Sequence, residues 1–205
     1  MPDMTSIVVF GAGGRAGRAV TAEARRRGVA VTAVVRDPAR HPDLPAVTGD
    51  VTDAAGVAAI VRGHDSAVNA VSPASGPEEL ATLDLDPDFF ATAAGALLDS
   101  GVPRVVAIGL VSNLDGADPL PEQFRAFADA HAAGLRRLRE ADRGWVMLTP
   151  PALLSAELPR LGGYRLGGET ISEGRLSYAD LAIAVLDEIE RPTVDGARVT
   201  VVSAG

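Results

Sequence analysis

Short apolar runs alternate with longer amphipathic stretches along most of this chain. The apolar runs are rich in β-branched residues and end in glycine, proline or polar turns, which is typical of strands buried on both faces of a parallel sheet. Strands are expected at residues 7–10, 29–35, 46–48, 66–71, 104–108, 145–149 and 198–203. Helices are expected from Gly17 to Arg27, from a cap at Thr52 or Asp53 to Val61, and over 87–100, 121–141 and 178–190. The alternation predicts an α/β fold with a doubly wound parallel sheet, in a single domain over residues 1–205.

Local signals mark two helix ends and one irregular segment. Gly28 follows the first helix and suits a left-handed C-cap. Ser177, with Asp180 three residues later, resembles a capping box before the helix at 178–190. The segment 153–174 is left to form a minimal, irregular lid over a substrate, and its glycines favour a mobile flap or a hairpin.

The first strand leads into a glycine turn at a helix start. The glycines follow a G-x-x-G-x-x-G spacing, and the residues of the turn are Gly11, Ala12, Gly13, Gly14, Arg15, Ala16 and Gly17. Gly11 allows the tight turn, Gly14 admits phosphates to the backbone, and Gly17 lets helix and strand pack closely. The free N–H groups and the positive end of the helix dipole then face an anion. The turn predicts a Rossmann-like fold that binds a dinucleotide through Gly11, Gly13, Gly14, Arg15, Ala16 and Gly17.

Composition removes several classes of partner and chemistry. Nineteen Lys and Arg residues against 27 Asp and Glu give a formal charge of −8, which argues against a nucleic-acid or anionic membrane partner. The chain has no cysteine, which excludes thiolate catalysis, and its three histidines lack metal-ligand spacing, so no metal is expected. A polar start and the lack of a long apolar run favour a cytoplasmic protein.

The end of the second strand predicts which cofactor is preferred. In this fold an arginine there meets the 2′-phosphate of NADP, whereas an acidic residue meets the ribose of NAD. Arg36 occupies this position, and with Arg15 it can form a cationic clamp. Asp37 can instead face the ribose, or simply pair with Arg36. The residues favour NADP(H) and leave NAD(H) open.

Further cofactor contacts are expected where the third and fourth strands end. Asp50 and Val51 are expected to flank the adenine ring, with Asp50 accepting from its amino group, although this stretch also reads as a helix cap. Small residues after the fourth strand leave room for the nicotinamide ribose over the sheet edge, and these are Ala70, Val71 and Ser72. After the sixth strand, Pro150 either walls the nicotinamide pocket or only ends the strand.

The proton-donating pair of short-chain dehydrogenases, Tyr-x-x-x-Lys, is absent. The lysine position holds Gly168 after Tyr164 and Ala182 after Tyr178. His131 on the helix after the fifth strand is the one candidate there for proton transfer near neutral pH, and a structural role is the alternative. Ser112 can donate a hydrogen bond to a substrate carbonyl, or it is a turn residue. We expect neither side chain to dominate the rate.

Nearly the whole chain resembles the short, atypical members of the short-chain dehydrogenase/reductase superfamily with an NAD(P)H-binding (NmrA-like) domain. Within that group it is most similar to the bacterial NADH-flavin reductase-like proteins, and more distantly to biliverdin reductase B. The segments that carry the resemblance are 11–17, 34–38, 49–53, 130–135, 163–168 and 171–186.

The resemblance implies a Rossmann body that binds NADPH beside a shallow, open substrate site. It implies hydride transfer to a flat aromatic acceptor such as a flavin or a quinone, with the proton supplied by solvent. Two alternatives stay open: a non-catalytic redox sensor that reports to a protein partner, and an NAD-dependent epimerase-like enzyme. The expected partner is a small-molecule substrate, and a monomer and a homodimer both remain open.

Overall fold

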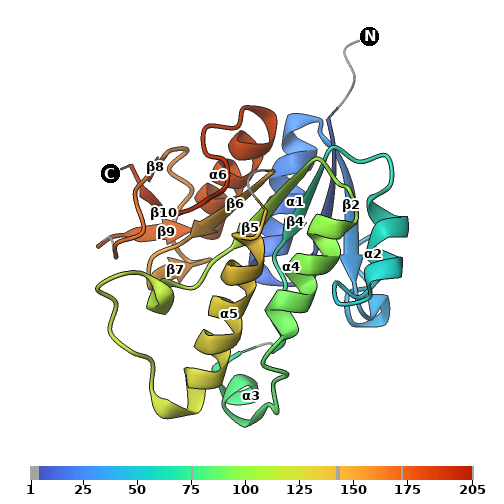
Figure 1. Cartoon of the computed structure of the whole chain (residues 1–205). Helices are drawn as coiled ribbons and strands as arrows, with labels where there is room; N and C mark the ends of the chain where they lie inside the picture. The colour runs from blue at the N-terminus through green and yellow to red at the C-terminus, as the bar shows by residue number, and fades with distance from the viewer. Residues whose placement is uncertain (1–4, 75, 142–143, 172, 205) are drawn as a thin grey trace.

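A computed structural model describes residues 5–74, 76–141, 144–171 and 173–204. Within these residues, eight strands form one central sheet in the order β3-β2-β1-β4-β5-β6-β10-β8 (Figure 1). Every pairing in it is parallel except that of β8 with β10. The strands are β1 (Ser6–Phe10), β2 (Ala30–Val35), β3 (Val47–Thr48), β4 (Ser66–Asn69), β5 (Arg104–Ile108), β6 (Trp145–Thr149), β8 (Tyr164–Leu166) and β10 (Ala197–Ser203).

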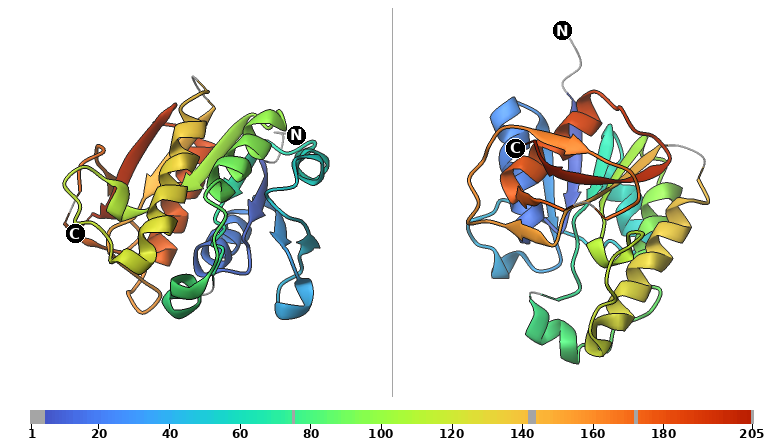
Figure 2. Two further views of the ribbon diagram at one scale, coloured as in Figure 1. Left: turned by 60° about the horizontal axis from the view of Figure 1, so that its bottom comes forward. Right: turned by 90° about the vertical axis from the view of Figure 1, so that its left-hand side faces the viewer.

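Helices cover both faces of the sheet and enclose two apolar layers (Figures 1 and 2). Helices α1 (Arg15–Arg27) and α6 (Tyr178–Glu190) pack together on one face, where Val20 and Leu181 are fully buried. Helices α2 (Ala54–Val61), α4 (Phe89–Asp99) and α5 (Arg125–Leu138) cover the other, where Val57 and Leu97 are fully buried. The expected doubly wound α/β fold is confirmed, and its core lies on both sides of β1, β4 and β5.

The structure adds local detail that the periodicity did not predict. A short helix, α3 (Pro77–Thr82), precedes α4, with Pro77 at its first turn followed by two glutamates, a composition that favours a helix start. The helix expected over 121–141 is divided into a 3₁₀ turn, η3 (Glu122–Phe124), and α5. Residues 142 and 143 lie outside the described residues.

The segment expected to be irregular contains two strands. β7 (Leu153–Ser155) pairs in parallel with β9 (Arg175–Ser177), and β8 extends the main sheet as an antiparallel edge. The buried carboxylate of Asp180 accepts hydrogen bonds from the backbone N–H groups of Leu161 and Gly162. Ser177 caps α6 as expected, since its hydroxyl accepts from the N–H of Asp180. The middle of the segment is thus tied to α6, while its role as a lid remains a prediction.

Where the chain is described, no helix is long and apolar enough to cross a membrane. The same residues contain no group of three or more histidines and carboxylates arranged to hold a metal ion.

Candidate active site

The glycine turn after β1 is packed too closely for side chains. Gly11 adopts a φ of +77°, in the left-handed region that favours glycine, and a Cβ placed there would lie 2.6 Å from the carbonyl oxygen of Ala70. A Cβ on Gly17 would overlap the carbonyl oxygen of Gly11. The expected close approach of α1 to the strands is therefore present, and the backbone of Ala70 forms part of this contact.

The start of α1 presents its backbone N–H groups without a side-chain cap. Gly14 is the N-cap residue, and no side chain or acidic first-turn residue occupies the helix end. The first N–H groups of a helix have no partner inside the helix, and the dipole makes this end attractive to anions. Arg15 follows at the first helical position and is exposed. The arrangement fits a pyrophosphate, as expected for a dinucleotide site.

Gly13 leaves space for a histidine that sequence reasoning missed. The backbone of Gly13 has a negative φ, yet a Cβ there would overlap the ring of His41. Arg18 connects the two, because its Nε donates to the carbonyl oxygen of Gly13 at 3.0 Å and its Nη2 lies 3.4 Å from Nδ1 of His41. Arg18 also forms a 2.6 Å ion pair with Asp43. The loop after β2 is thereby fixed against the glycine turn by residues far apart in the sequence.

The two arginines predicted to clamp a phosphate are both available to a ligand. Arg15 and Arg36 are exposed, and neither has a hydrogen bond or an ion pair within the described part of the chain. The alternative pair of Arg36 with Asp37 does not form. Asp37 instead accepts from the N–H of Ala39 at 3.0 Å and caps the short turn η1 (Pro38–Arg40).

The two residues expected around the adenine differ in burial, because the side chain of Asp50 is exposed and that of Val51 is buried. Asp50 accepts from both the N–H and the hydroxyl of Thr52, at 2.9 and 2.7 Å, and remains exposed. The side chain of Val51 is 3% exposed and packs in the core beneath α2, so only its backbone can face a nucleotide. Asp53 caps α2 through the N–H of Ala55.

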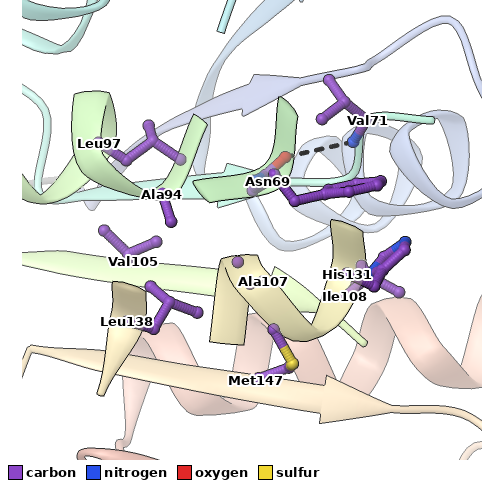
Figure 3. Close-up of a pocket in the computed structure, with 12 residues that line it drawn as sticks. Asn69, Val71, Ala94, Leu97, Val105, Ala107, Ile108, His131, Leu138 and Met147 are labelled. Carbon is purple, nitrogen blue, oxygen red and sulfur yellow. Dashed lines mark hydrogen bonds between the residues drawn. The ribbon is translucent and has the colours of Figure 1, made fainter. Parts of the chain in front are cut away.

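Residues expected beside the nicotinamide follow β4 and β6. Asn69, the last residue of β4, accepts from the N–H of Val71 at 3.4 Å through its side chain (Figure 3). The hydroxyl of Ser72 donates to the carbonyl oxygen of Ala74 at 2.7 Å, and Pro150 is buried. These residues lie at the carboxyl ends of neighbouring strands, the edge where ligands of this fold bind.

A small pocket opens between α4 and α5 at this same edge (Figure 3). Twelve residues line it, among them Asn69, Val71, Phe90, His131 and Met147, and none of the twelve carries a carboxylate, lysine or arginine side chain. The sequence signals for Asn69 and Phe90 were weak, because one reads as a strand end and the other as a helix core residue.

His131 lies inside an aromatic cluster. Its ring centroid is 3.7 Å from that of Phe90 and 4.7 Å from that of Phe127, and the residue is 9% exposed. No hydrogen bond joins its ring to another described residue. Burial lowers the pKa of His131 to about 3, so the ring is neutral near pH 7. A neutral imidazole with this pKa is a poor proton donor.

Two buried hydroxyls at this edge also lack partners. Ser112 lies in the turn η2 (Val111–Asn113) after β5, and its Oγ is buried without a hydrogen bond to any described group. Thr149, at the end of β6, is fully buried, and its Oγ1 also has no hydrogen bond to any described group. The pocket lining includes His131 but neither hydroxyl, so the structure does not bring Ser112 and His131 together on one cavity wall.

The loop after β5 and the segment after β8 are fastened to each other. Asp115 donates its N–H to the carbonyl oxygen of Glu169 at 2.9 Å and accepts from the N–H of Ile171 at 2.8 Å. Arg198 of β10 donates to the carbonyl oxygen of Asn113 at 2.7 Å and pairs with the carboxylate of Glu169 at 3.1 Å. The loop after β5 and the segment after β8 therefore share one set of contacts.

Residues 11–192 match the model of a family described as NAD(P)H-binding. The chain is 29% identical to the uncharacterised protein YwnB of Bacillus subtilis, over 96% of this chain and 98% of YwnB. A crystal structure of a Streptococcus pneumoniae protein, provisionally described as an NADH-flavin reductase, matches 97% of this chain and 99% of its own at 24% identity with a TM-score of 0.78. A Burkholderia pseudomallei protein, provisionally described as exported, matches 97% and 100% at 30% identity with a TM-score of 0.79.

The contact between Gly13 and His41 gives a prediction of coupled stability. We expect Gly13→Ala to lower the free energy of unfolding by about 1–3 kcal/mol, because the new methyl group meets an imidazole held by Arg18. When the histidine ring is absent, in the His41→Ala variant, Gly13→Ala should lower the free energy of unfolding much less than it does in the wild type. Urea denaturation of the double-mutant cycle measures the coupling. Gly17→Ala serves as the control, because its clash is with backbone and His41→Ala should not relieve it. Simple additivity of Gly13→Ala and His41→Ala would contradict the contact.

The buried His131 gives a prediction about acid stability. The unfolded chain binds a proton at this histidine below its ordinary pKa of 6.5, whereas the folded chain does so only near pH 3. The contribution of this site to stability is therefore complete above pH 6.5 and decreases as the pH falls toward 3. The His131→Phe variant lacks this component. We therefore expect the difference in urea midpoint, variant minus wild type, to rise as the pH falls from 7 to 4. A constant difference over that range would show that His131 binds its proton as readily in the folded protein as in the unfolded chain.

Proposed function

Because the chain belongs to the NAD(P)H-binding family, we propose that it is an NADPH-preferring reductase of a flat conjugated acceptor such as a flavin or a quinone. The observation that carries the proposal is the uncapped start of α1, with two partnerless arginines beside it and an uncharged aromatic pocket at the same sheet edge. Bound NADPH supplies a hydride, which adds two electrons to the acceptor, and solvent supplies the accompanying proton.

The preference for NADPH is supported by charge at the adenosine end. Arg36 follows β2, where the 2′ position of the ribose lies in this fold, and Arg15 opens α1. Both side chains are exposed and neither spends its donors on a carboxylate of the described chain. A guanidinium forms strong, often bidentate hydrogen bonds with a phosphate. The 2′-phosphate of NADPH therefore has two donors that NADH cannot use.

The acceptor class is supported by what the pocket lacks. A carbonyl or sugar substrate needs a positioned acid, and His131 is neutral with a pKa far below the physiological range. Its ring and that of Phe90 instead offer aromatic surface for a flat ring system. Positioning of donor and acceptor can supply most of the rate enhancement in such a transfer. In this proposal the residues of the pocket hold and orient the acceptor, and they present no charged side chain to it.

The cofactor preference predicts an effect confined to NADPH. We expect NADPH to bind more tightly than NADH, and Arg36→Ala to weaken NADPH binding by about 1.5–3 kcal/mol while NADH binding changes little. Isothermal titration calorimetry with both cofactors measures this. Arg62→Ala is a matched control, because Arg62 is exposed at the far end of α2. Equal affinities for the two cofactors, or equal losses in Arg36→Ala, would contradict the preference.

The proposed reaction predicts consumption of NADPH with flavins or quinones as acceptors. We expect His131→Ala to lower the rate less than tenfold, with a flat pH profile near neutrality, because a general acid would be worth a hundredfold or more. Absorbance at the reduced nicotinamide band follows the reaction. Tight NADPH binding with no turnover across the panel would favour a redox sensor over an enzyme.

A further inference from the structure

The formal charge of the chain is concentrated in two segments. Residues 76–89 and 110–129 contain nine carboxylates and one arginine, Arg125, so they account for the whole formal charge of −8, and the rest of the chain balances. All nine carboxylate residues are exposed, and they are Glu78, Glu79, Asp84, Asp86, Asp88, Asp115, Asp118, Glu122 and Asp129. Apart from Glu79, none of them forms an ion pair within the described chain.

Both segments adjoin residues that line the pocket. α3 of the first segment contacts η3 of the second, and Figure 1 shows α3 below α4 and beside the start of α5. The first segment ends in α4 next to the pocket residue Phe90, and the second ends two residues before His131. Asn113 fixes the second segment to α5 through the carbonyl oxygen of Ala128 at 2.8 Å. Seven of the nine carboxylates, those of residues 78–88 together with Glu122 and Asp129, therefore form an acidic rim beside the end of the pocket that Phe90 and His131 line.

The interior of the pocket differs from this rim. His131 is nine-tenths buried, has no hydrogen-bond partner in the described chain, and lines the cavity as a neutral ring. No arginine or lysine lines the pocket to compensate an anion. The exposed cations Arg15, Arg36 and Arg40 belong instead to the turns after β1 and β2, on the cofactor side. The site thus has a cationic end and an anionic end.

From this arrangement we propose that the acceptor is a neutral or cationic flat molecule, and that acceptors carrying a phosphate or sulfonate are selected against. The inference rests on the proposed function and assigns its substrate class. Clustered charge of one sign raises or lowers the local concentration of a charged ligand, with effects on association of tenfold or more. At physiological ionic strength such a field extends about 8 Å, so it acts on groups near the acidic rim.

Riboflavin and FMN form a matched pair of probes, because they share one isoalloxazine ring and differ in a phosphate group. We expect kcat/KM with NADPH to be roughly tenfold or more higher for riboflavin than for FMN at low ionic strength, with the ratio falling as salt is added. The double variant Asp84→Asn/Asp86→Asn should move the ratio toward one. Asn keeps the acceptor oxygen that Asp86 offers to the N–H of Asp88.

The control is Asp99→Asn/Glu140→Gln, which removes two charges near the opposite ends of α4 and α5 and should leave the ratio unchanged. Quenching of flavin fluorescence in the presence of NADP⁺ measures the same selectivity without turnover. Equal binding of the two flavins, tighter binding of FMN, or no binding of either would overturn the inference. Selective binding of riboflavin without any turnover would overturn the proposed reaction and leave the charge selectivity in place.

Discussion

The close contact of the glycine turn with the ends of β1 and β4 is the constraint on which the site depends. Gly11 has a backbone that favours glycine and no room for a Cβ beside Ala70, while Gly17 touches the carbonyl of Gly11. These two contacts bring the start of α1 to the carboxyl edge of the sheet with its N–H groups facing outward. Without them the start of α1 would move away from the carboxyl ends of the strands, and the proposed cofactor site would lose its backbone N–H groups.

Burial determines what the pocket side of the site can do. A histidine on this helix is a natural candidate for proton transfer, yet two phenylalanine rings enclose His131 and lower its pKa to about 3. The same enclosure makes it an apolar wall for a ring system. The proposed reaction therefore does not depend on an acid from this helix, and the pocket offers an aromatic surface without charged side chains.

The features that could be predicted from the sequence are those encoded locally. The alternation of strands and helices, the glycine turn and the Ser177 cap depend on neighbours along the chain, and the structure contains each of them. The contact of His41 with Gly13 could not be predicted, because it joins residues far apart and gives no periodic signal. β7 and β8 were missed since strands of three residues have too little periodicity and depend on their pairing partners. The orphaned hydroxyl of Thr149 likewise becomes visible only once its neighbours are in place.

The contacts among Asn113, Asp115, Glu169 and Arg198 have a consequence for motion. Segments that share buried hydrogen bonds open together, as one cooperative unit with a single free energy. The loop after β5 and the segment after β8 are joined in this way, and β10 anchors both to the sheet. Release of either segment breaks contacts of the other, so we expect the loop after β5 and the segment after β8 to open as one unit.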